Sequence, residues 1–168
     1  MIKITESCTG CFACVSICPL QSISLQVNEF GELYPTIDQT KCVDCGMCTK
    51  VCPTNSPVLG VKPEAVYAAY SKNLEIYKKS TSGGISMEIA KVILSNGGIV
   101  YGTGMEGVRA NIIRVDSEED LCLIQGSKYV QSHMNDAMRH IKRDLEAGKK
   151  VAFFGVPCQV AYLIAFLR

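Results

Sequence analysis

Ten cysteines stand out in this chain of 168 residues, and eight of them form two groups with the same spacing. Each group reads Cys-x2-Cys-x2-Cys-x3-Cys-Pro, and the second repeats the first 34 residues later. The members are Cys8, Cys11, Cys14 and Cys18 in the first group, and Cys42, Cys45, Cys48 and Cys52 in the second. Thiolates are soft metal ligands, so a repeated group of four indicates metal chemistry.

This spacing is typical of bacterial ferredoxins that bind [4Fe–4S] clusters. Three thiolates on a tight loop reach three corners of one cubane, whereas the fourth cysteine points away and serves the other cluster. The pattern therefore predicts two clusters with exchanged ligands. One is assigned to Cys8, Cys11, Cys14 and Cys52, and the other to Cys42, Cys45, Cys48 and Cys18. Gly10 and Gly46 lie inside the loops, where a Cβ close to inorganic sulfide is expected to be unfavourable.

Zinc and disulfides explain the cysteines less well. A zinc site uses about four ligands, which would leave half of the thiols without a role. Disulfides need an oxidising compartment, and the first residues lack the apolar stretch of a secretion signal. We therefore expect a cytoplasmic protein with reduced thiols.

Charge and hydropathy exclude two further classes. The formal net charge is +1 without a basic run, so the sequence predicts no binding to nucleic acid. No apolar run is long enough for a membrane span. Acidic residues outnumber basic ones before residue 60, which indicates either a docking face for a basic redox partner or an ordinary solvated surface.

The first domain is predicted over residues 1–60 as a small α+β ferredoxin-like unit with βαββαβ topology. Apolar residues alternate over 23–27 and 33–37, and the turn residues 28–31 between them predict a hairpin. Because large apolar residues are few, the clusters are expected to hold this unit together.

A second, α/β domain of mixed sheet covered by helices is predicted over residues 65–168. Strands are expected over 66–70, 99–101, 111–115 and 151–154, and helices over 85–95, 117–124, 135–147 and 159–167. The helix 85–95 is expected to pack through Ile85, Ile89, Val92 and Ile93. The last helix is apolar on all faces, so we expect a buried element and a domain that continues beyond residue 168.

Several segments of the second domain have residues that suit a ligand site, but each segment also has a simpler structural explanation. Ser82, Gly83 and Gly84 precede a helix and suit either a phosphate or a plain N-cap. Residues 126–132 hold Ser127, Lys128 and Tyr129, which suit either a ring and phosphate ligand or a polar turn. Residues 102–107 match a dinucleotide fingerprint, but a strand follows, so a turn is predicted there.

The two remaining cysteines receive different interpretations. Cys158 opens a helix after a buried strand and is predicted to be a nucleophile or a cluster ligand. Cys122 lies between two leucines and is predicted to be a core residue.

Residues 82–84, 126–132 and 155–159, behind a two-cluster ferredoxin, resemble the coenzyme F-420 hydrogenase/dehydrogenase beta subunit family. The resemblance implies an FAD site near Ser82, Gly83 and Gly84, lined by Lys128 and Tyr129. It also implies that Cys158 is one ligand of a third iron–sulfur cluster, and that F-420 is a candidate hydride acceptor.

The sequence therefore predicts an electron-transfer oxidoreductase module in which two clusters exchange electrons with a flavin. The alternative is a scaffold whose clusters only stabilise a small fold while the second domain docks a partner. In either case the direction of electron flow is not fixed by the sequence.

Overall fold

The computed structural model describes residues 2, 4, 7–58 and 60–168, which separate into two compact units. Unit 1 comprises residues 1–59 together with 156–168, and unit 2 comprises residues 60–155. The last helix groups with the first unit by its contacts, whereas the predicted second domain over residues 65–168 includes it.

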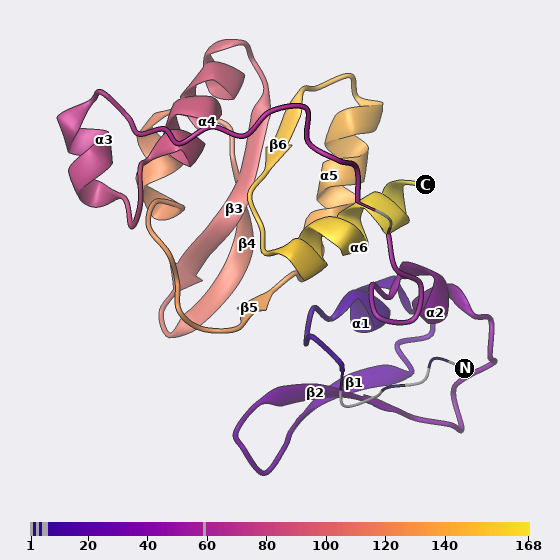
Figure 1. The fold of residues 1–168 in the computed structure, drawn as a ribbon. Helices are drawn as coiled ribbons and strands as arrows, with labels where there is room; N and C mark the ends of the chain where they lie inside the picture. The colour runs from indigo at the N-terminus through magenta and orange to yellow at the C-terminus, as the bar shows by residue number, and fades with distance from the viewer. Residues whose placement is uncertain (1, 3, 5–6, 59) are drawn as a thin grey trace. The chain divides into compact units, whose positions relative to one another are not determined.

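In chain order, unit 1 has one short helix before a hairpin and one after it. Helix α1 (Ala13–Ile17) precedes strands β1 (Ile23–Val27) and β2 (Leu33–Ile37), and helix α2 (Met47–Val51) follows them. The two helices pack together on the same side of the hairpin, and α6 (Pro157–Leu167) contacts α2 (Figure 1). The two strands pair antiparallel with Ile23 opposite Ile37, so the predicted hairpin is confirmed. The outer strands of a βαββαβ unit are not formed among the described residues.

The core of unit 1 is small and rich in sulfur. Ile2, Cys14 and Ile23 form its buried centre, and three more cysteines pack against them. Those three are Cys18, Cys48 and Cys52. Positions that an ordinary domain fills with aliphatic side chains thus hold thiols.

Unit 2 is built on a mixed four-stranded sheet with the order β5-β4-β3-β6. The long hairpin of β3 (Ile99–Glu106) and β4 (Arg109–Val115) lies in its middle (Figure 1). Strand β6 (Val151–Phe153) pairs parallel to β3, and β5 (Ser132–His133) pairs parallel to β4. A turn at Gly107 closes the β3–β4 hairpin, so the glycine pattern over 102–107 is a turn between strands, as predicted.

Helices cover both faces of this sheet, as expected for a mixed sheet. Val100 packs with residues of α4 (Ile85–Ser95), and the next residue, Tyr101, bonds to α5 (Ala137–Glu146) on the opposite face. The remaining elements are helix α3 (Leu74–Lys79) and the 3₁₀ helix η1 (Glu119–Leu123).

Two predictions about the elements of unit 2, one for a strand and one for the buried face of a helix, are wrong. Residues 66–70 form no strand, and Val66, Tyr67 and Tyr70 are exposed, because no neighbouring strand pairs with this segment. Helix α4 has the predicted bounds, but its buried residues are Met87, Ala90 and Leu94. Ile89 and Val92, which were expected to face the core, are exposed.

A buried polar contact joins α5 to the sheet. Tyr101, only 1% exposed, donates its hydroxyl hydrogen to Asp144 Oδ2 at 2.6 Å. Arg114 Nε donates to the same oxygen at 2.9 Å. Hydrogen bonding from Arg114 keeps the pKa of Asp144 below its ordinary value, so the contact is stabilising above the unfolded pKa and is lost as the pH falls through the folded one.

We predict that Asp144→Ala lowers the free energy of unfolding by about 1–3 kcal/mol, because it leaves the Tyr101 hydroxyl buried without this acceptor. Urea unfolding of the full chain, followed by circular dichroism, measures the loss. The matched control is Glu146→Ala on the same helix, whose partner Lys142 lies 4.0 Å away at the surface. An equal loss in both variants would contradict the prediction.

Candidate metal centres

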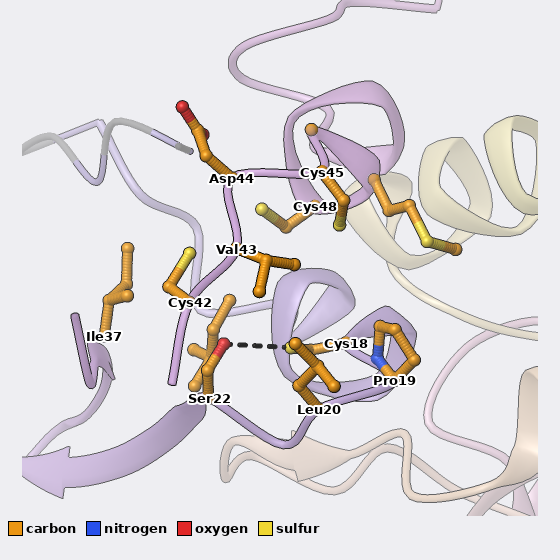
Figure 2. A pocket seen from close by; sticks show the side chains of 13 residues that line it. Cys18, Pro19, Leu20, Ser22, Ile37, Cys42, Val43, Asp44, Cys45 and Cys48 are labelled. Atoms are coloured by element: carbon orange, nitrogen blue, oxygen red, sulfur yellow. Dashed lines mark hydrogen bonds between the residues drawn. The ribbon is translucent and has the colours of Figure 1, made fainter. Parts of the chain in front are cut away.

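The eight repeated cysteines line two separate cavities in unit 1, and each cavity takes one cysteine from the other half of the repeat. The first cavity is lined by Cys8, Cys11, Cys14 and Cys52. The second is lined by Cys42, Cys45, Cys48 and Cys18 (Figure 2). Both cavities are partly open to solvent. This distribution of cysteines is the one expected for exchanged ligands.

The two cysteine loops share one backbone conformation. Gly10 and Asp44 occupy equivalent positions and both have positive φ, at 63° and 53°. Phe12 and Gly46, also equivalent, have φ of 59° and 75° and cap helices α1 and α2. A Cβ on Gly46 would meet nothing within 4 Å, so within the chain it is the left-handed backbone that favours glycine there.

The cavities differ in exposure. In the first, Cys11 and Cys14 are buried, with Phe12 between them. In the second, Cys45 is exposed, and so are the apolar side chains of Leu20 and Val43 beside it. The first cavity therefore has two buried cysteines, whereas the second has an exposed cysteine and exposed apolar side chains at its edge.

Burial lowers the acidity of two thiols in the first cavity, Cys11 and Cys14. Desolvation raises the pKa of Cys14 to about 12, and neighbouring cysteines add to the shift. Burial also raises the pKa of Cys11, and the nearby thiols of Cys52 and Cys158 reinforce it. Four thiolates together in this cavity therefore need a cationic partner.

Cys18 in the second cavity behaves differently. Partial burial would raise its pKa, but hydrogen bonds from the Ser22 side chain and from the backbone N–H groups of Ser22, Leu20 and Gln21 hold the pKa below its ordinary value. The Ser22 Oγ lies 3.1 Å from Cys18 Sγ, as the dashed line in Figure 2 marks. In the first cavity, Asn55 Nδ2 donates to Cys52 Sγ at 3.2 Å.

The donor sets fit a cluster better than a single ion. Among the described residues, no three His, Cys, Asp or Glu side chains converge closely enough to hold one metal ion. Four thiols spread around a cavity instead match the corners of a cubane, which carries several irons. Cys18 and Cys52 would complete the ligand sets of the opposite halves.

Two of the predicted flavin segments lie together in unit 2. The backbone N–H of Ser127 donates to Thr81 Oγ1 at 2.8 Å, which joins the segment before α4 to residues 126–132. Gly84 has φ +77° and begins α4 without a side-chain cap. Gly83 approaches the chain itself, because an added Cβ would come within 2.5 Å of the Ala69 carbonyl oxygen.

The side chains of the same segments are less suited to a ligand. Lys128 Nζ donates to the carbonyl oxygens of Gln125 and Gly126 at 2.8 and 3.0 Å, and burial lowers its pKa. Tyr129 is 86% exposed. The structure therefore brings the backbone of these segments together, while Lys128 is already bonded within its own turn.

The cysteines outside the repeat lie in different settings. Cys158 is half-buried in the first turn of α6, within unit 1. Cys122 is exposed, so its prediction as a core residue is wrong; in η1, Leu121 takes the buried position instead. Sequence reasoning missed Ser22 and Asn55, because nothing in the cysteine pattern marks the residues that bond to the ligand sulfurs.

Family comparisons agree with the geometry. A 4Fe-4S dicluster domain model matches residues 7–56, and a second model with the same description matches residues 34–119. The second match covers just over half of the chain. No curated protein matches. Neither match is to the F-420 beta subunit family, so that resemblance stays a prediction. None of the described helices is long and apolar enough to cross a membrane.

We predict that Cys18→Ala removes the cluster held by residues 42–48, although Cys18 belongs to the other half of the repeat. Iron should fall from about eight to about four per chain. The electron paramagnetic resonance spectrum of the reduced protein should lose the signal that Cys45→Ala also loses, and should keep the signal that Cys11→Ala loses.

The control for this prediction is Cys122→Ala, which removes an exposed thiol outside both cavities. It should change neither the iron content nor the spectrum. A Cys18→Ala spectrum that matches the spectrum of Cys11→Ala would contradict the exchanged ligands.

Proposed function

The chain belongs to the 4Fe-4S dicluster domain family, and on that premise we propose that it is an electron-transfer protein whose two clusters serve a flavin bound by unit 2. Iron–sulfur electron transfer follows from the family itself. The observation that carries the two-cluster form is that each of two cavities is lined by four cysteines drawn from both halves of the repeat.

When bound, a [4Fe–4S] cluster takes up and releases single electrons, and a flavin exchanges one or two. The residues of this chain supply the surroundings. Cysteine thiolates would hold the irons, and the buried Cys11 and Cys14 would place part of the first centre away from water. Hydrogen bonds to Cys18 and Cys52 stabilise negative charge on those sulfurs.

The second cavity supports exchange with a redox partner protein. Cys45 is exposed there, and Val43, 70% exposed, and Leu20, 46% exposed, flank the cavity. An apolar surface around an accessible centre suits a transient protein contact, because it lets a partner approach closely and exclude water. We infer that a partner exchanges electrons at this centre.

Fewer observations support the flavin site than support the clusters. The contact between Thr81 and Ser127 joins the two segments that the family resemblance assigns to FAD. The uncapped start of α4 offers backbone N–H groups to a phosphate. Lys128 would have to leave the carbonyl oxygens of Gln125 and Gly126 to reach a ligand. The roles of Cys158 and of F-420 rest on the resemblance alone.

We predict that the full chain, reconstituted anaerobically, contains about eight iron and eight sulfide per chain and gives paramagnetic signals on reduction. Metal and sulfide analysis with paramagnetic resonance measures this. Zinc in place of iron, or a reduced form without a signal, would contradict the proposal. Four irons per chain would indicate a single cluster and would contradict the proposal of two.

We further predict that the iron-loaded chain binds FAD at unit 2. Titration should quench flavin fluorescence to saturation, and Lys128→Ala should weaken binding, because it removes the one cation in residues 126–132. Lys142→Ala on α5 is the control and should leave binding unchanged. Absence of saturation with an intact iron content would reject the flavin and favour a partner-docking role for unit 2.

A further inference from the structure

The two exchanged cysteines receive side-chain hydrogen bonds from residues that are not equivalent in the repeat. Ser22, four residues after Cys18, places its hydroxyl 3.1 Å from the Cys18 sulfur. Asn55, three residues after Cys52, donates its side-chain N–H to the Cys52 sulfur at 3.2 Å. One sulfur thus meets a hydroxyl and the other an amide.

In the other half of the repeat, the side chains at the equivalent positions do not bond to a ligand sulfur. Ser56 occupies the place of Ser22 in the second half, yet its hydroxyl donates to the Thr49 carbonyl oxygen at 2.9 Å. Gln21 occupies the place of Asn55 in the first half, and its exposed side chain makes no hydrogen bond among the described residues. The repeat therefore preserves the ligands but exchanges the residues that bond to them.

A hydrogen bond to a ligand sulfur favours the reduced cluster, because reduction adds negative charge that the donor stabilises. The size of the effect depends on whether water can replace the lost donor. Ser22 is only 3% exposed, so removal of its hydroxyl leaves the Cys18 sulfur without that partner. Asn55 is exposed, so water takes its place.

Other groups near the two cavities also favour the reduced state at the centre that contains Cys18. Cys18 also accepts hydrogen bonds from the backbone N–H groups of Leu20, Gln21 and Ser22. In the other cavity, Cys11 and Cys14 are 9% and 7% exposed, and burial disfavours added charge. The reduced state is thus better stabilised at the centre that contains Cys18.

We propose that Ser22 and Asn55 set the potentials of the two centres separately, and that Ser22 makes the centre of Cys18, Cys42, Cys45 and Cys48 the one of higher potential. Ser22 acts as a positioning residue through the Cys18 sulfur. This inference rests on the proposed two-cluster function and adds a direction: within unit 1, electrons pass from the buried centre to the exposed one.

The test is a redox titration of the anaerobic, iron-loaded full chain, followed by paramagnetic resonance. The centres are assigned with Cys45→Ser, which alters the signal of the exposed centre. The wild-type chain should show two midpoint potentials, the higher at that centre. Ser22→Ala should lower this potential and leave the other unchanged, and Ser22→Thr, which keeps a hydroxyl, should restore much of the shift.

Two further variants sharpen the test. Ser56→Ala, the matched control, removes the equivalent hydroxyl without touching a ligand sulfur and should shift neither potential. Asn55→Ala should lower the potential of the buried centre by less than Ser22→Ala lowers that of the exposed one.

An unchanged higher potential in Ser22→Ala, a shift at the wrong centre, or an equal shift in Ser56→Ala overturns the proposal. So does a wild-type chain whose exposed centre has the lower potential. If Ser22→Ala fails to retain iron, the order of the two wild-type potentials decides. A wild-type chain without iron would instead reject the proposed function.

Discussion

The structure of unit 1 depends on a small core in which cysteines occupy positions that a larger domain fills with aliphatic side chains. Cys14 lies at the centre of that core, and Cys18, Cys48 and Cys52 pack against it. Burial raises the pKa of Cys14 to about 12, so a thiolate there is unfavourable until a cation balances its charge. With the proposed ligand sets, iron binding would replace the protons and link the two halves through the exchanged cysteines, which would couple metal loading to folding.

The repeat is stricter in its backbone than in its side chains. Both loops adopt positive φ at the same two places, although one uses glycine at the first place and the other at the second. Asp44 and Phe12 accept the left-handed conformation that glycine takes in the opposite loop. Ligand geometry constrains the backbone closely, whereas the residues beside the sulfurs are free to differ. That freedom would allow the two proposed centres to have different potentials.

Sequence patterns predicted the elements with strong local signals, namely the cysteine loops, the 23–37 hairpin and most helices of unit 2. They failed where the outcome depends on tertiary neighbours. The apolar residues 66–70 suit a strand but find no pairing partner. Helix α4 has apolar residues around most of its circumference, so the pattern alone could not show that Met87 and Leu94 face the core. Cys122 turned outward because Leu121 filled the buried position.

The two cavities differ both in how closely a partner can approach the centre and in how well added negative charge is stabilised. Exposure of Cys45 and the apolar rim near Val43 lets a partner come close to the second centre, and the same exposure lets solvent stabilise added charge. The hydrogen-bond donors around Cys18 also stabilise added negative charge. At the first centre two cysteines are buried beside Phe12, and the side-chain donor Asn55 is exposed, so that water can replace it. A site that is both easiest to reach and easiest to reduce is suited to hold the electron until a partner docks, and this combination requires no movement of the chain.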